Sequence, residues 1–67
     1  MTEYQIVVTT AARTVHFRTE WTDEREQSEL LAVEFREHYS AMGVNIRLVA
    51  RTAGSDGWIY ETLMETE

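Results

Sequence analysis

The sequence of 67 residues contains no cysteine, no proline and no lysine, and it has only three glycines. Without cysteine, the chain can form neither the disulfide framework of small secreted domains nor a cysteine-based zinc finger. Without proline, repeats or low-complexity segments, it offers no linker and no domain boundary. We therefore expect residues 1–67 to form a single domain with one thin core.

Long apolar runs are also missing. No stretch approaches the roughly 20 apolar residues that a membrane span requires. The first ten residues, MTEYQIVVTT, have neither the basic start nor the long apolar run of a signal peptide. Hydrophobic residues nevertheless make up 43% of the chain, which is typical of a folded domain rather than a disordered acidic tail. We expect a folded cytoplasmic protein without membrane contact.

Negative charge is concentrated in one segment. The net charge is −6, and residues 20–37, with seven carboxylates and two arginines, contribute −5 of it. This balance argues against a protein that coats nucleic acid through its overall field. The simplest interpretation of the acidic segment is the solvated face of a helix. The alternative is an acidic helix that mimics DNA and inhibits a DNA-binding enzyme.

The first two strands are predicted from residue type and alternation. Residues 4–10 are rich in β-branched side chains, and residues 13–21 alternate between apolar and polar types. A short turn at residues 11–12 joins these strands into a hairpin with four apolar side chains on one face, and a longer loop is the alternative because Ala-Ala is a poor pair for a primed turn. The predicted cross-strand pairs are Val8 with Val15 and Ile6 with Phe17.

A helix follows the hairpin. Thr22 or Asp23 is the predicted cap, and Glu26 stands three residues after Asp23, as in a capping box. Gly43 is the expected stop signal. One apolar stripe should pack on the sheet, and the acidic residues mostly lie away from it. Its members are Leu31, Phe35, His38 and Met42.

Two further strands are predicted at residues 44–52 and 58–64, separated by the turn sequence AGSDG. The parity of the last strand decides which of its side chains enter the core. One parity buries Glu61 against Leu48, which is costly for an unpaired carboxylate. We therefore expect the other parity, with Trp58, Tyr60 and Met64 toward the core. The predicted core is Phe17, Leu31, Phe35, Ile46, Leu48 and Trp58.

These elements define an α+β fold of order β-β-α-β-β, a four-stranded antiparallel sheet with one helix packed on one face. The other face of the sheet should mix arginine with aliphatic side chains, a composition common at the centre of protein interfaces. An ordinary exposed sheet face is the competing interpretation. The predicted partner-binding residues are Val7, His16, Arg18, Arg47, Val49, Arg51, Ile59, Glu61 and Leu63.

Nucleic-acid binding through this arginine-bearing sheet face is the alternative function. Platforms for single-stranded nucleic acid stack bases on exposed aromatic rings. Here Phe17, Trp58 and Tyr60 are all expected on the helix-covered side, so this alternative is disfavoured.

Metal binding and catalysis find little support. Glu34 and His38 have the i, i+4 spacing of a ligand pair, but His38 is expected on the packed stripe and His16 on the far side of the sheet. No serine stands in a nucleophile motif, and so short a chain leaves little room for a cleft. We expect no metal, no cofactor and no enzymatic activity.

The whole chain resembles the small orphan proteins of actinobacteriophages and GC-rich actinobacteria. The resemblance rests on the absence of lysine and on the segments ARTV, FRTEW, FREHY and VARTAGSDGW within one small acidic domain. It implies a non-enzymatic protein that binds a host or phage macromolecule. Together with the sheet face, it predicts a binding module that acts by protein–protein contact, with a second copy in a homodimer or another protein as partner.

Overall fold

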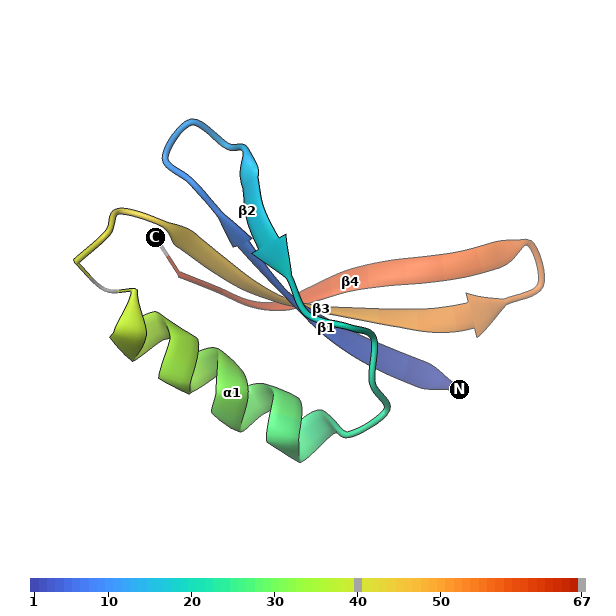
Figure 1. The fold of residues 1–67 in the computed structure, drawn as a ribbon. Helices are drawn as coiled ribbons and strands as arrows, with labels where there is room; N and C mark the ends of the chain where they lie inside the picture. The colour runs from blue at the N-terminus through green and yellow to red at the C-terminus, as the bar shows by residue number, and fades with distance from the viewer. Residues whose placement is uncertain (40, 67) are drawn as a thin grey trace.

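The computed structural model describes residues 1–39 and 41–66, and it confirms the predicted α+β architecture (Figure 1). Four antiparallel strands form one open sheet in the order β2-β1-β3-β4, with a single helix between β2 and β3 in the chain. No helix in the described ranges is long and apolar enough to cross a membrane. The elements are β1 (Thr2–Thr9), β2 (Val15–Arg18), α1 (Arg25–His38), β3 (Asn45–Gly54) and β4 (Gly57–Thr66).

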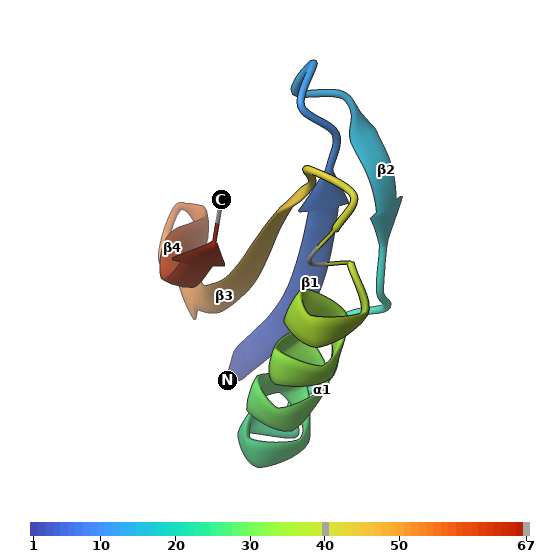
Figure 2. The ribbon, with the colours of Figure 1, turned by 90° about the vertical axis from the view of Figure 1, so that its left-hand side faces the viewer.

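The two central strands carry the core. β1 and β3 pair along eight residues, with Ile6 opposite Leu48 and Val8 opposite Ile46. Alternate side chains of both strands are buried where α1 crosses them, because successive residues of a strand point to opposite faces (Figure 2). The buried core cluster is Tyr4, Ile6, Val8, Ala32, Ile46, Leu48 and Ala50.

The helix begins later than the sequence predicts. Its N-cap is Glu24, which makes no side-chain capping bond, so the predicted capping box of Asp23 and Glu26 is wrong. The reason lies in Thr22, whose backbone exchanges hydrogen bonds of 2.6 and 3.0 Å with Tyr4. Because this bridge holds the chain extended at Thr22, the first helical turn starts only after it.

The buried face of α1 is also rotated from the predicted stripe. Ser28 and Ala32 are its buried residues, and their small side chains let the helix approach the sheet closely. Leu31, Phe35 and Tyr39 pack around this contact and remain half-buried. His38 and Met42, predicted on the stripe, are exposed. The helix ends at His38, and Gly43 lies in the turn beyond it with a φ of 65°.

The register predicted for the first hairpin is wrong. Val8 pairs with Phe17 and Thr9 pairs with Val15, so His16 is an extra residue that forms a bulge in β2. Phe17 therefore faces the helix, with its ring centroid 5.4 Å from that of Phe35, whereas Val15 lies on the face of Thr9.

The predicted parity of β4 is right after a second bulge and wrong before it. Met64 pairs with Leu48 on the helix side as expected, but Val49 pairs with Thr62, so Leu63 is the extra residue. Before this bulge the faces are reversed: Tyr60 pairs with Arg51 on the open face. Trp58 shares that face and is 43% exposed, so it is not part of the core.

The observed parity does not bury the Glu61 carboxylate, so the energetic cost predicted for it does not arise. Glu61 pairs with the buried Ala50 and thus lies on the helix side of the sheet, yet it remains exposed. The helix packs on β1 and β3 and leaves this part of β4 uncovered. The β3–β4 hairpin extends past the helix and ends in a two-residue turn, where Gly57 has a φ of 125° that favours glycine (Figure 1).

Candidate binding surface

The open face of the sheet, opposite α1, brings together five of the nine predicted partner-binding residues. In β1 and β3 this face is made by the residues that alternate with the core. Arg18 joins it because it pairs with Val7 across the first hairpin. The five residues on the open face are Val7, Arg18, Arg47, Val49 and Arg51.

The other four predicted residues lie elsewhere, and both bulges explain why. His16 turns toward the helix, with its ring centroid 6.3 Å from that of Tyr39. Ile59 and Glu61 lie on the helix side of β4, where Ile59 is 65% exposed. Leu63, the bulged residue, packs against the core cluster. The predicted placement of these four side chains on the open face is wrong.

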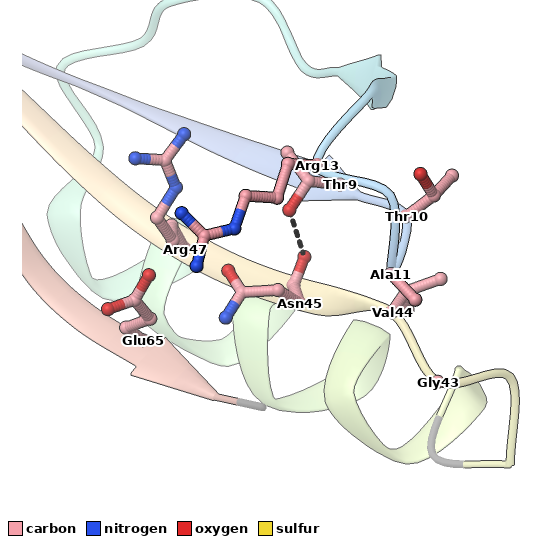
Figure 3. A pocket seen from close by; sticks show the side chains of 9 residues that line it. All are labelled: Thr9, Thr10, Ala11, Arg13, Gly43, Val44, Asn45, Arg47 and Glu65. Atoms are coloured by element: carbon pink, nitrogen blue, oxygen red, sulfur yellow. Dashed lines mark hydrogen bonds between the residues drawn. The ribbon is translucent and has the colours of Figure 1, made fainter.

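The open face is concave. A hollow of about 410 Å³ lies over its centre, between Arg18, Arg47 and Tyr60, and Val7 forms part of its lining. A second hollow of about 520 Å³ lies at the end of β1 and the start of β3 (Figure 3). Arg47 borders both. Val7 is only 6% exposed, which is consistent with arginine stems that cover apolar surface while their charged ends stay in water.

Three aromatic residues that sequence reasoning did not place here complete the open face: Trp21, Trp58 and Tyr60. Tyr60 is 59% exposed, and its ring centroid lies 6.2 Å from that of Trp21. The guanidinium carbon of Arg51 lies 4.1 Å from the centroid of Trp21 and 4.2 Å from that of Trp58. Arg51 therefore makes two cation–π contacts, one with each indole. We call these four residues the aromatic–arginine cluster.

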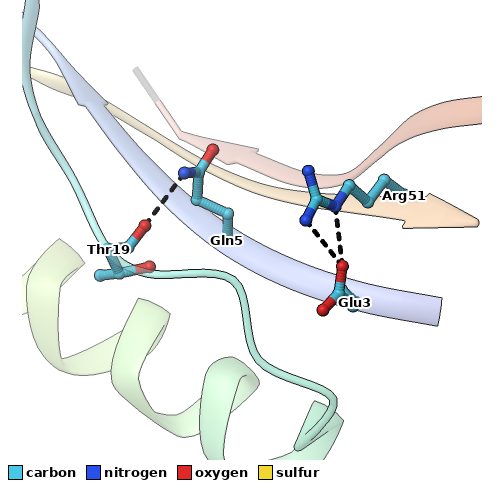
Figure 4. Close-up of polar contacts among 4 residues, drawn as sticks. All are labelled: Glu3, Gln5, Thr19 and Arg51. Carbon is cyan, nitrogen blue, oxygen red and sulfur yellow. Dashed lines mark hydrogen bonds and ion pairs between the residues drawn. The ribbon is translucent and has the colours of Figure 1, made fainter. Parts of the chain in front are cut away.

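Arg51 is fixed further by an ion pair with Glu3 on the neighbouring strand (Figure 4). Its Nη2 lies 2.7 Å and its Nε 2.9 Å from one carboxylate oxygen of Glu3. The two side chains are only 21% and 24% exposed. Such partial burial reduces solvent screening, so the pair holds Arg51 more firmly than an exposed pair would.

Hydrogen bonds to β1 place Trp21 over the sheet. The Gln5 Nε2 donates to the carbonyl oxygen of Thr19 at 3.0 Å (Figure 4), and the Thr19 hydroxyl accepts from the backbone N–H of Ile6 at 2.9 Å. The bridge between Tyr4 and Thr22 secures the other side of Trp21. The sequence could have placed Trp58 and Tyr60 on the open face only through the other parity of β4. It could not have placed Trp21 there, because the local pattern does not reveal these long-range hydrogen bonds.

Charge is segregated between the two sides of the molecule. Four of the six arginines border the open face or its hollows: Arg13, Arg18, Arg47 and Arg51. Among the described residues, the acidic ones there are Glu3, which is paired with Arg51, Glu65, which lies opposite Arg47 on β4, and Glu61, which borders the central hollow. Most other carboxylates belong to α1 and its flanking segments. On α1, the Glu29 carboxylate, 2.8 Å from Arg25 Nε, raises the pKa of Arg25.

Features of other site types are few. Among the described residues, no three side chains of histidine, cysteine, aspartate or glutamate gather closely enough to hold a metal ion. Comparison of the chain with protein-family models, curated proteins and solved structures finds no match. The function must therefore be argued from the open face itself.

Proposed function

We propose that the protein is a non-enzymatic binding module whose open sheet face contacts a partner protein. The observation that carries this proposal is the aromatic–arginine cluster. Tryptophan, tyrosine and arginine are the residue types most enriched among the side chains that dominate protein–protein binding energy. In this chain they converge on one concave face, from the β3–β4 hairpin and from the distant segment around Trp21.

The arginine of the cluster is immobilised before binding, and this supports the same proposal. A side chain that must be immobilised on binding costs about 0.5–1.5 kcal/mol of conformational freedom. Arg51 is already held by Glu3 and by both indoles before any partner arrives. Trp58 and Tyr60 nevertheless stay well exposed, so their apolar surface is available for burial by the partner.

The chemistry of the partner follows from the charge of this face. The basic side chains favour a protein surface with carboxylates around an apolar centre, since complementary charge steers association. In line with the resemblance to small phage proteins, we propose a host or phage protein as the partner. A second copy of the chain is the first partner to test, because the face carries both signs of charge and a two-fold interface must be self-complementary.

Single-stranded nucleic acid is the second candidate ligand. The specific observation in its favour is the exposure of Trp58 and Tyr60 on the arginine-bearing face, where bases could stack. The acidic helix lies on the opposite side of the sheet, and salt at physiological strength screens charge beyond about 8 Å. The net charge of −6 weighs against this candidate, because it opposes the long-range attraction of a polyanion.

Tyr60 and Ile59 offer a matched pair of variants. They are neighbours on β4, have similar exposure and point to opposite faces of the sheet. Immobilised protein is used to retain binding proteins from an actinobacterial lysate treated with nuclease, and affinity for each retained protein is then measured. We expect Tyr60→Ala to weaken binding by roughly tenfold or more and Ile59→Ala by less than about threefold.

Three controls separate the alternatives. Light scattering over a concentration series detects a self-partner directly. Quenching of tryptophan fluorescence by a single-stranded oligonucleotide, reversed by salt, would replace the protein partner with nucleic acid. Replacing Glu26, Glu29 and Glu37 together by glutamine should leave partner binding nearly unchanged. A large loss in that variant would assign the binding to the acidic helix and support a DNA mimic instead.

A further inference from the structure

The hollow at the end of β1 and β3 has a chemistry that the aromatic–arginine cluster does not share. It lies over the open face where the β1–β2 loop meets the start of β3, and its volume is about 520 Å³ (Figure 3). Its polar side chains include two guanidinium groups, from Arg13 and Arg47, and the amide of Asn45. Figure 3 shows the Arg13 guanidinium between the side chains of Arg47 and Asn45, while the Arg47 guanidinium extends away from Asn45.

The donors of this hollow have no partners within the described part of the chain. Arg25 and Arg51 each form an ion pair with a glutamate, at 2.8 and 2.7 Å. In contrast, the side chains of Arg13, Arg47 and Asn45 form no hydrogen bond or ion pair with the described residues. Two guanidinium groups that share a hollow repel one another, and the single carboxylate of Glu65 on its wall offsets only part of this excess of positive charge.

The loop conformation is what brings Arg13 to this place. The N–H of Arg13 donates to the carbonyl oxygen of Thr10 at 2.8 Å, and the N–H of Thr10 donates to the carbonyl oxygen of Thr14 at 2.8 Å. Arg13 itself has a φ of 65°. Three-residue hairpin loops of this kind usually carry glycine at the left-handed position. Arginine at that position sends a cationic side chain over the sheet toward Arg47 (Figure 3).

We propose that this hollow binds a doubly charged oxyanion of the phosphate class, held by Arg13, Arg47 and Asn45. Guanidinium groups present paired donors that match two oxygens of a phosphate, and the amide of Asn45 supplies a further donor. The Thr9 hydroxyl is already engaged, since it donates to the carbonyl oxygen of Asn45 at 3.4 Å. The proposal does not depend on the proposed protein partner, because Arg13 and Asn45 line only this hollow, although Arg47 also borders the central one beside Tyr60.

Glu65 sets the affinity of this site. It pairs with Arg47 across β3 and β4 and lies on the wall of the hollow, without an ion pair to either arginine among the described residues. A carboxylate at this position opposes a bound anion through like-charge repulsion. Neutralising Glu65 should therefore strengthen anion binding, whereas neutralising either arginine should weaken it. A long-range effect of net charge would give the same two signs, so the control at Arg36, on the helix and outside the lining of the hollow, is what distinguishes a local site from it.

The test follows the side-chain Nε–Hε signals of the arginines by NMR while inorganic phosphate is added at constant ionic strength and pH 7.5. We expect saturable shifts at Arg13 and Arg47 and none at Arg36 on the helix. Arg13→Gln should weaken phosphate binding by roughly threefold to tenfold, and Glu65→Gln should strengthen it. Arg36→Gln is the matched control and should leave the affinity unchanged.

A parallel titration with phenyl phosphate asks whether the natural ligand is the free ion or a phosphate ester. Tighter binding of the ester assigns the site to esterified phosphate, and tighter binding of the inorganic ion assigns it to free phosphate. Shifts of equal size at all arginines, or shifts that never saturate, would overturn the proposal. So would an unchanged affinity in both Arg13→Gln and Arg47→Gln, each checked by circular dichroism to be folded.

Discussion

The central strands of this sheet are regular, whereas each edge strand contains a bulge. β1 and β3 are hydrogen-bonded on both sides, and their side chains alternate regularly between core and open face over eight paired residues. β2 and β4 each have one free edge, and each contains an extra residue, His16 in β2 and Leu63 in β4. A bulge in an edge strand disturbs one ladder, whereas a bulge in a central strand would disturb two.

The difference has a functional consequence. The bulge at Leu63 lets β4 place Met64 in the core and, a few residues earlier, Tyr60 and Trp58 on the open face. A regular strand could not do both, because its faces alternate without interruption. The edge strand thus supplies the exposed aromatic rings, while the central strands supply the arginine that orders them.

Deletion of one residue from a central strand and of one from an edge strand should give the largest difference in stability. Deletion of Val7 from β1 moves every side chain on one side of the deletion to the opposite face, so we expect a chain that no longer folds. Deletion of Leu63 removes the bulge and the packing of its side chain against the core cluster, but it leaves the pairs of Leu48 with Met64 and of Val49 with Thr62 intact. That variant should fold with a loss of about 1–2 kcal/mol.

Circular dichroism and urea unfolding measure both deletions. A folded Val7 deletion would show that β1 tolerates a bulge and would remove the distinction between central and edge strands.

Truncation of side chains should separate the strands by a smaller amount. Leu48 of β3 is 2% exposed, and Leu48→Ala should cost about 2–5 kcal/mol through lost burial and the cavity that remains. Ile59 of β4 is 65% exposed, and Ile59→Ala should cost about 0.5 kcal/mol or less. The free energies of unfolding in urea give both values. Equal losses would place Ile59 in a packed environment and contradict the uncovered helix side of β4.

The aromatic–arginine cluster joins the two kinds of strand, and its contribution should be intermediate. Arg51→Met keeps the aliphatic stem but removes the ion pair with Glu3 and both cation–π contacts, so we expect a loss of about 1–2 kcal/mol. Arg18→Met is the control on the same face, where no ion pair is found among the described residues, and it should cost about 0.5 kcal/mol or less. Unfolding followed by tryptophan fluorescence reports both stability and the surroundings of the indoles.

The smallest effect is expected in the loop that leads into the bulged edge strand β2. Arg13 holds a left-handed conformation that costs a side-chain-bearing residue about 1–2 kcal/mol, and glycine relieves it at some cost in unfolded-chain entropy. Arg13→Gly should therefore stabilise the fold by about 0.5 kcal/mol. A measured destabilisation would mean that the Arg13 side chain contributes to folding, whereas the phosphate site needs it only for binding.

The success of sequence reasoning follows the same division between central and edge strands. The β-branched composition of residues 4–10, with their hairpin pairing, and the alternation in residues 44–52 correctly identified the core positions of β1 and β3, including Ile6, Ile46 and Leu48. The two edge strands exist where they were predicted, although β2 is only Val15–Arg18 within the predicted 13–21, and their side chains were assigned to the wrong faces on one side of each bulge. The argument that the observed parity of β4 would bury Glu61 failed because it assumed that one helix covers the whole sheet.

The amino-acid sequence by itself determined the order of elements, the antiparallel α+β class and the turn between Gly54 and Gly57, because local periodicity and turn chemistry record these features directly. Only the tertiary structure decided the two bulges, the rotation of α1 onto Ser28 and Ala32, and the meeting of Trp21 with Arg51 and Trp58. Each of these depends on contacts between residues far apart in the chain, where close packing and a few hydrogen bonds outweigh the local pattern.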